Sequence, residues 1–479
     1  MEKLHRKTGS CRFEFQRAVC GFRKPAAAVA AVLCFCLVSA ESGRARQDWL
    51  EAYREPASRI IGAALADRFA WDRLAELSDN IGNRLSGSPQ LDQAIQWAVE
   101  QMKQDGLENV RAEKVMVPHW VRGRESCEIT SPAQRALVML GLGNSVGTPP
   151  EGIEAEILVV RDFAELEAGA DRARGKIVVY NVPYAGYGQT VQYRSTGASR
   201  AAKHGAVGVL LRSVGMPGLR TPHTGALDYA ADLAKIPAAA ITLEDAEALQ
   251  RMQDRGTRVT VRLKMEAQML PDAESANVVG ELVGRERPEE VILVGGHLDS
   301  WDVGTGSTDD GGGCIAAWSA LRILKRLGLQ PRRTIRVVLF TNEENGLRGG
   351  LAYRDKYRDQ LANHVLMLES DSGVFRPLGF GFSGGDKARS AIQEIATLLR
   401  GIGVDRVSAG GGGGDINPAV VQGRIPSMSL EVDGSEYFRV HHTPADTIDK
   451  INPTDLSLCE AAIAVMSYVV ADMPVRLGQ

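Results

Sequence analysis

The sequence lacks an excess of charge of either sign. Its 56 Lys plus Arg residues nearly balance 59 Asp plus Glu residues, which leaves a formal net charge of −3 at pH 7. It has neither the cationic stripe that binds nucleic acid nor an acidic tail, so we expect no nucleic-acid partner. Partners must therefore be inferred from individual sites.

Cysteine is scarce beyond the first forty residues. Four of the seven cysteines precede residue 40, and the other three are Cys127, Cys314 and Cys459. An odd and widely spaced set does not form a disulfide framework, and it lacks the paired spacing of a structural zinc site. We expect these three side chains to be buried as small apolar groups.

The first forty residues have the pattern of a secretory leader. Basic residues precede an apolar run over 26–38, and Val38-Ser39-Ala40 supplies the small residues of a cleavage site. The run is shorter than the ~20 residues that a membrane span needs. We predict a signal peptide over 1–40 and a secreted or periplasmic protein without membrane attachment after cleavage; an uncleaved membrane anchor is the alternative.

The remaining chain is too long for one ordinary hydrophobic core, and its hydrophobic periodicity changes twice. Helical spacing runs from about 47 to 104, short β-rich runs separated by Gly and Pro follow, and apolar strands alternate with helices after Asn277. This order predicts an α/β fold: a mixed, mostly parallel sheet flanked by helices, interrupted by a β-rich insert. We assign 41–125 and 269–479 to the catalytic domain and 126–268 to the insert.

Ionisable residues follow four of the expected strands. Those strands cover 291–296, 334–341, 365–369 and 427–432. They are followed by His297, by Glu343 and Glu344, by Asp371, and by a loop that contains His442. Ligands bind at the carboxyl edge of open α/β sheets, so these side chains should meet in one crevice.

A set of His, Asp and Glu without thiolate suits catalytic zinc. Asp309 adds a carboxylate just before a glycine run that leads into a helix. Two zinc ions, the carboxylates of Asp309, Glu344 and Asp371, and one bridging hydroxide balance to zero charge. The hydroxide would attack the scissile carbonyl, which leaves Glu343 as general base. Glu369 competes with Asp371 as ligand.

Two further positions complete the expected site. Asp299 lies two residues beyond His297, where its carboxylate could accept the second ring proton and fix the tautomer. Glycines 410–414 could form a pocket wall close to the substrate backbone, with Asp415 near a free amine. The remaining candidates are set aside as surface, capping or backbone-bonded residues: His119, His204, His223, His364, Asp310, Asp433 and Glu436.

Four motifs carry a family resemblance. They are Gly296-His297-Leu298-Asp299-Ser300, Thr308-Asp309-Asp310-Gly311-Gly312-Gly313, Asn342-Glu343-Glu344 and His442-Thr443-Pro444-Ala445-Asp446-Thr447. Together they resemble the di-zinc aminopeptidase and glutamate carboxypeptidase family, and the resemblance extends from about residue 115 to 472. It implies a zinc-exopeptidase fold, a protease-associated insert and a homodimer.

The resemblance also implies how two zinc ions are held. His297 and Asp371 would bind one ion, Glu344 and His442 the other, with Asp309 bridging them. Many relatives have Tyr before the last histidine, where it stabilises the oxyanion, but this chain has His441. An imidazole can donate the same hydrogen bond with a different pH profile. Tyr437 is the weaker substitute.

The sequence thus predicts an exported di-zinc exopeptidase that hydrolyses dipeptides or short peptides with free termini. An aminopeptidase acting on longer peptides uses the same metal core. A binding protein that has lost catalysis is a different class, disfavoured because every expected ligand and Glu343 are present. A glutamine-cyclising acyltransferase shares the general fold, but the insert and the Glu pair favour hydrolysis.

Overall fold

The computed structural model describes residues 49–479, and Ala52–Gln479 form one compact unit. The predicted signal peptide over 1–40, with its cleavage point after Ala40, lies outside the described residues. Cys127, Cys314 and Cys459 are free and buried, as the spacing predicts.

The catalytic sheet has eight strands in the order β1-β10-β12-β11-β13-β16-β14-β15. Their bounds are β1 Glu108–Val121, β10 Gln268–Leu282, β12 Arg333–Phe340, β11 Arg287–His297, β13 His364–Glu369, β16 Ser427–Val432, β14 Pro377–Ser383 and β15 Arg406–Ala409. The central strands β12, β11, β13 and β16 run parallel, while β10 and β14 pair antiparallel beside them. The expected mixed α/β sheet is therefore present.

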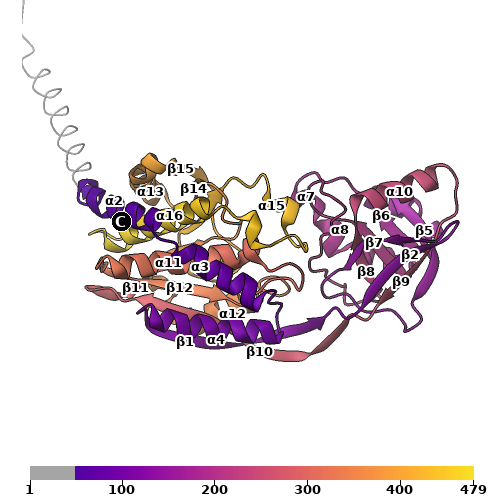
Figure 1. Cartoon of the computed structure of the whole chain (residues 1–479), viewed down its shortest axis with the longest axis horizontal. Coiled ribbons are helices and arrows are strands. Elements are labelled where there is room, and N and C mark those ends of the chain that lie inside the picture. The colour runs from indigo at the N-terminus through magenta and orange to yellow at the C-terminus, as the bar shows by residue number, and fades with distance from the viewer. Residues whose placement is uncertain (1–48) are drawn as a thin grey trace, which may run out of the picture. The chain divides into compact units, whose positions relative to one another are not determined.

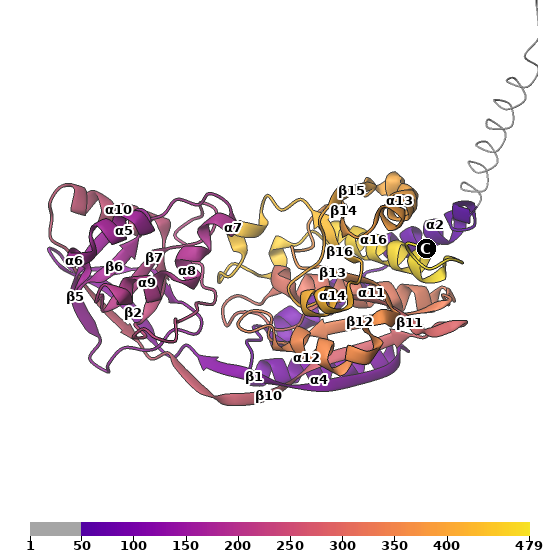
Figure 2. The same cartoon turned by 180° about the vertical axis from the view of Figure 1, so that it is seen from behind.

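The central strands are buried on both faces. β12 and β13 are buried along their whole length, and β11 is buried from Val291 to His297. Continuous apolar runs are typical of parallel strands covered by helices on both sides. α4 (Pro89–Gln104), α11 (Gly312–Arg326) and α16 (Pro453–Asp472) cover one face (Figure 1). α12 (Arg348–Lys356) and α14 (Asn417–Gly423) cover the other (Figure 2).

The early helices pack on the catalytic sheet layer. α2 (Arg54–Ala66) packs against α16, and α3 (Phe69–Glu76) packs against α11. α4 begins with Ser88 as N-cap, whose hydroxyl accepts the Leu91 N–H, followed by Pro89 at the first position. The expected contribution of this N-terminal region to the catalytic layer is thus observed.

α16 is the one helix within residues 49–479 that is long and apolar enough to cross a membrane. Within the structure 78% of its most apolar window is buried. Helices that are apolar all round are also typical of protein cores. α16 packs against α2, α11 and the catalytic sheet, so it is a core helix of this fold.

A second eight-stranded sheet is formed by residues that lie between β1 and β10 in the sequence. Its order is β3-β2-β9-β5-β6-β7-β8-β4. The bounds are β2 Glu125–Ser131, β3 Arg135–Leu137, β4 Met139–Gly141, β5 Ile153–Val160, β6 Ile177–Tyr180, β7 Gly208–Arg212, β8 Ala238–Ile241 and β9 Thr260–Met265. We call residues 125–265 the insert; its protease-associated character and the boundaries 126–268 stay predictions.

Candidate active site

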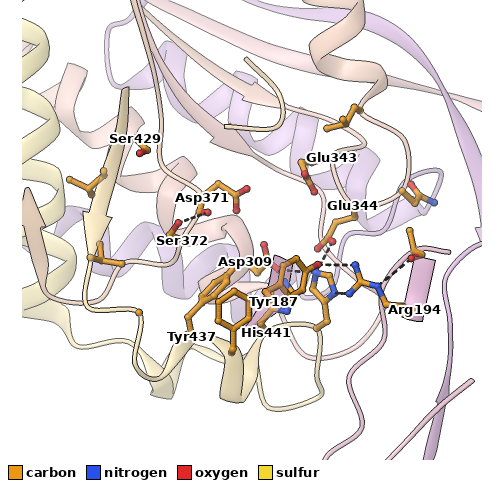
Figure 3. A pocket seen from close by; sticks show the side chains of 18 of the residues that line it. Tyr187, Arg194, Asp309, Glu343, Glu344, Asp371, Ser372, Ser429, Tyr437 and His441 are labelled. Carbon is orange, nitrogen blue, oxygen red and sulfur yellow. Dashed lines mark hydrogen bonds and ion pairs between the residues drawn. The ribbon is translucent and has the colours of Figure 1, made fainter. Parts of the chain in front are cut away.

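The predicted side chains meet at the carboxyl edge of the parallel strands. His297 ends β11, Glu344 follows β12 and Asp371 follows β13. Asp309 belongs to a short helical turn, η2 (Ser307–Gly311), and His442 comes shortly after α15 (Tyr437–Val440). Figure 3 shows Asp309, Glu344 and Asp371 directed into one cavity. The topology rule applied to the sequence therefore predicted this grouping correctly.

Asp309 lies at the centre of the cluster. One oxygen, Oδ1, is 3.2 Å from His297 Nε2, and that nitrogen is 3.4 Å from Asp371 Oδ1. The other oxygen, Oδ2, is 3.1 Å from His442 Nε2, which is also 3.1 Å from Glu344 Oε2. The acid thus connects two groups of ligand atoms, which is the geometry that a bridging ligand between two cations requires.

Several of these buried atoms make no hydrogen bond. They are His297 Nε2, Asp309 Oδ2 and Glu344 Oε1. Buried polar atoms are almost always satisfied, so orphaned nitrogen and oxygen atoms that converge on one place indicate a missing partner. Nitrogen and carboxylate oxygen donors without thiolate fit zinc in a catalytic role. The residues present therefore fit the metal that the sequence predicts.

The electrostatics of the cluster are those of an acid-rich site. Burial and the neighbouring Asp309 raise the pKa of Glu344 to about 7. Burial opposes a charged imidazole, but Glu344 and Asp309 together raise the pKa of His442 to about 10. Carboxylates this close repel one another unless positive charge lies between them. Cations bound at this point would relieve that repulsion.

Asp299 supports the site differently from our expectation. The His297 Nδ1–H donates to the main-chain oxygen of Asp299 at 2.9 Å, while the nearest carboxylate oxygen is 3.8 Å from that nitrogen. The carboxylate instead accepts the main-chain N–H groups of Glu343 at 3.0 Å and of Glu344 at 3.3 Å. The prediction that this carboxylate takes the ring proton is wrong. The side chain holds the Glu343-Glu344 turn, which no spacing rule reveals.

Asp446 holds the loop that carries Asp309. Its carboxylate accepts the N–H of Thr308 at 2.7 Å and of Asp309 at 3.1 Å. The sequence placed Asp446 within a motif but gave it no role. Because the carboxylate anchors the main chain at Thr308 and Asp309, it helps to fix where the Asp309 side chain points.

Glu369 is excluded from the ligand cluster by its own hydrogen bonds. Its carboxylate accepts the N–H of Ile416 at 3.0 Å and of Asp415 at 3.4 Å. Asp371, by contrast, directs Oδ1 toward His297 Nε2. Of the two acids that follow β13, the geometry therefore favours Asp371 as the ligand.

Asp415 does not lie at the cavity wall, contrary to our expectation. It is 1% exposed and both carboxylate oxygens are buried without a hydrogen-bond partner. A Cβ on Gly413 would come within 2.1 Å of the Glu369 carboxyl carbon, and one on Gly414 within 2.8 Å of Glu343 Oε1. The glycine run thus makes room for two acids of the protein rather than for substrate.

His441 lies in the cavity against the ligands. Its ring stacks on the His442 ring with centroids 3.5 Å apart, and its Nε2 is 3.4 Å from Asp309 Oδ2. Burial lowers the pKa of His441 well below its ordinary value, and the adjacent His442 lowers it further. A neutral imidazole can still donate one hydrogen bond. Tyr437 lines the same cavity, and its ring centroid is 5.0 Å from that of His441, with the two rings tilted by 50°.

The insert supplies the other wall of the cavity. The cavity has a volume of about 800 Å³, and Tyr187, Arg194 and Asp228 of the insert line it together with Asp309, Glu344, Asp371 and His442. Arg194 Nη2 donates to the Tyr187 hydroxyl at 2.8 Å (Figure 3). The sequence gave no signal for these residues, because they reach the site only through the packing of distant segments.

The insert also holds the histidine loop. The Thr224 N–H donates to the His442 carbonyl at 2.9 Å, and the His442 Nδ1 faces the Thr224 carbonyl at 3.3 Å. His223, which the sequence set aside, donates from Nδ1 to the His441 carbonyl at 2.8 Å. His442 has a φ of 61°, a conformation costly for a residue with a side chain. These bonds stabilise that conformation and leave Nε2 free to face the acids.

Comparison of the chain with known proteins identifies its family. The family model described as "Peptidase family M28" matches residues 277–467. Mouse carboxypeptidase Q is 46% identical over 439 residues, which cover 91% of this chain and 93% of that protein. The chain belongs to peptidase family M28. Human carboxypeptidase Q is 47% identical over 420 residues, 87% of this chain and 89% of that protein.

Solved structures agree with the fold. A peptidase M28 precursor from Shewanella amazonensis has a TM-score of 0.86 and 35% identity, and covers 90% of this chain and 99% of its own. A structure described as a zinc aminopeptidase from Bacillus subtilis has a TM-score of 0.64 and 21% identity, and covers 84% and 95%; this likeness concerns the fold alone.

Membership of the family confirms that the protein is an enzyme, a metallo-exopeptidase, as the sequence predicts. Carboxypeptidase and aminopeptidase activity are both consistent with its relatives.

Proposed function

We propose that this protein is an exported exopeptidase with two zinc ions that hydrolyses dipeptides or short peptides with free termini, in the manner of carboxypeptidases. The observation that carries the proposal is the position of Asp309 between two groups of nitrogen and oxygen atoms beside the 800 Å³ cavity: those of His297 and Asp371, and those of His442 and Glu344. In the proposed site His297 and Asp371 would hold one ion and Glu344 and His442 the other, with Asp309 shared between them.

Bound there, zinc would polarise the scissile carbonyl and make a water molecule acidic enough to attack near neutral pH. Glu343 is the group placed to take the proton of that water. It lines the cavity beside the ligands, and its turn is fixed by the Asp299 carboxylate. Burial and the neighbouring Asp371 and Glu344 raise the pKa of Glu343 well above its ordinary value. A raised pKa lets a carboxylate accept a proton and pass it to the leaving amine.

His441 is the proposed donor to the carbonyl oxygen as negative charge develops there. Its ring lines the cavity and its Nδ1 has no hydrogen-bond partner. The stacked His442 ring and the His223 bond to the main chain fix its orientation. A preorganised donor stabilises an oxyanion without a reorganisation cost during the reaction.

The lining charges support a substrate with both termini free. Arg194 and Arg406 offer positive groups to a carboxylate, and Asp228 and Glu431 offer negative groups to an amine. Arg406 pairs with Glu431, whereas Arg194 forms no ion pair among the described residues and donates to the Tyr187 hydroxyl and to the Thr224 and Ala226 carbonyls. Groups of both signs around a cavity of this size suit a zwitterionic dipeptide better than a long, internally cleaved chain.

The test combines metal content with substrate choice. The purified protein is expected to contain two zinc ions per chain and to release free amino acids from a dipeptide panel, with activity lost on chelation and restored by zinc. Activity that persists after complete metal removal would refute the metal-dependent mechanism. Hydrolysis of peptides with a blocked carboxyl terminus, but not of those with a blocked amino terminus, would favour the aminopeptidase alternative.

Secretion and oligomeric state stay predictions. Secretion through the 1–40 leader is checked by N-terminal sequencing of the exported protein, which should begin after Ala40. The homodimer is checked by light scattering coupled to size exclusion.

A further inference from the structure

Arg84 is a fully buried cation that does not touch the cavity. It lies between η1 (Leu77–Ile81) and α4, and its exposed fraction is 0%. Within residues 49–479 no ion pair joins its guanidinium to a carboxylate. Burying an arginine without such a partner is costly unless every N–H finds an acceptor. The positions of those acceptors therefore indicate the structural role of Arg84.

The guanidinium donates to four main-chain carbonyls. Nε donates to Leu298 O at 2.7 Å, and Nη2 donates to Gly306 O at 2.9 Å. Nη1 donates to Thr305 O at 2.7 Å and to Gly82 O at 2.6 Å. Leu298 directly follows His297, and Gly306 precedes Asp309 by three residues. The planar guanidinium of Arg84 thus joins the loop that follows His297 to the loop that leads to Asp309. Both residues are proposed ligands of the same metal ion.

The main chain around Arg84 extends this connection. The Arg84 N–H donates to Ser300 Oγ at 3.0 Å, and the Ser300 N–H donates back to the Arg84 carbonyl at 3.2 Å. Ser86 Oγ contacts Asp299 Oδ2 at 3.5 Å and accepts from Asn342 Nδ2 at 3.0 Å. The segment therefore also reaches the turn that carries the Glu pair.

The loop around the guanidinium is shaped to receive it. Gly306 has a φ of 57°, and a Cβ there would lie 2.3 Å from Ser300 Cβ and 2.9 Å from Arg84 Nη2. A larger residue would therefore displace the loop or the arginine. Lysine could not replace the fork, because one ammonium cannot reach carbonyls spread over two loops.

We propose that Arg84 is a positioning residue of the metal centre: by joining the His297 loop to the Asp309 loop it sets the separation of these ligands, and hence the affinity for zinc. The proposal rests on the proposed function for the metal and for His297 and Asp309 as its ligands. Groups that orient metal ligands change affinity typically by 10–100-fold when removed, without touching substrate.

The test compares Arg84→Lys with Arg333→Lys. Arg333 is the control, because it is also 0% exposed and donates to Met473 O at 2.7 Å, but it lies at the amino-terminal end of β12, opposite the site, and it pairs in addition with Glu290. Zinc affinity is measured by competition with a chromophoric chelator, and unfolding temperature is measured on the metal-free protein. The absorption spectrum of the cobalt-substituted protein reports ligand geometry directly.

We expect Arg84→Lys to weaken zinc binding 10–100-fold and to change the cobalt spectrum, whereas Arg333→Lys lowers the unfolding temperature and leaves zinc affinity within about twofold. At saturating zinc, Arg84→Lys should lower kcat more than it changes KM. Ser300→Ala removes only the hydroxyl that accepts the Arg84 main-chain N–H, so it should weaken zinc binding less. This variant serves as the test if Arg84→Lys does not fold.

Wild-type zinc affinity in both Arg84→Lys and Ser300→Ala would overturn the proposal, as would equal losses in Arg84→Lys and Arg333→Lys. The result is independent of the substrate. If the wild-type protein binds zinc but cleaves no dipeptide, the proposed function fails while the Arg84 comparison still decides its own question.

Discussion

Glu460 allows a quantitative prediction about stability. It lies in α16, is 1% exposed, and its Oε1 has no hydrogen-bond partner. Burial, with Asp67 adding to it, raises the pKa of Glu460 from 4.5 to about 8. An acid whose pKa is raised by folding is more easily ionised in the unfolded chain. Its favourable contribution is therefore complete below pH 4.5 and is lost as pH rises toward 8.

The size of this effect follows from the two pKa values. Each unit of difference corresponds to about 1.4 kcal/mol, so the loss reaches about 3 kcal/mol at pH 7 and about 5 kcal/mol above pH 9. Glu460→Gln removes the charge while keeping the shape. The variant should match the wild type near pH 5 and become progressively more stable than it at higher pH.

Thermal unfolding at pH 5, 7 and 9 measures the difference. For a folded unit of this size about 1 kcal/mol corresponds to roughly 1 °C, so the gap should reach several degrees at pH 9. Glu100→Gln, on the exposed face of α4, serves as control and should follow the wild type throughout. Parallel curves for Glu460→Gln and wild type across the pH range would refute the reasoning.

Three predictions concern the site. Glu343→Gln should lower kcat by 10²–10⁴-fold while the zinc content stays at the wild-type value, because the change removes the proton acceptor and no ligand; loss of zinc in this variant would contradict the assignment. Asp371→Asn should reduce zinc stoichiometry toward one per chain, whereas Glu369→Gln should retain both ions, and metal analysis of the two variants separates the competing acids. His441→Tyr should keep activity within about tenfold of wild type and flatten the acidic side of the pH profile, whereas His441→Ala should lose roughly 10²–10³-fold; equal losses would exclude a hydrogen-bond donor at this position.

The grouping of the site side chains could be predicted because it follows local rules. Strands buried on both faces are continuous apolar runs, and parallel strands bring the residues that follow them to one edge. His297, Glu344 and Asp371 satisfy both conditions. The alternation of strands and helices after Asn277 and a separate segment between Val121 and Gln268 could be predicted from changes in periodicity, whereas the helices within that segment, such as Gly197–Lys203 and Leu243–Asp254, were not expected.

The remaining parts of the site depend on packing between distant segments. Asp299 and Asp446 act through main-chain N–H groups, and such contacts leave no spacing signature. Asp415 looked like a wall residue because the glycines before it suggested space for a ligand, but that space is filled by Glu369 and Glu343. Arg84 has no motif of its own in a single sequence. Its role is visible only once four carbonyls from separate loops surround it.

The bonds between Thr224 and the His442 loop have a consequence for how the enzyme can be reduced in size. A catalytic fragment made by joining Val121 directly to Gln268 would keep every ligand in its sequence, yet its last histidine would lose the neighbour that holds it in a left-handed conformation. Such a fragment should still form the sheet but should bind metal more weakly than the full-length protein. Evolutionary gain or loss of the insert would then require a new way of supporting that one histidine.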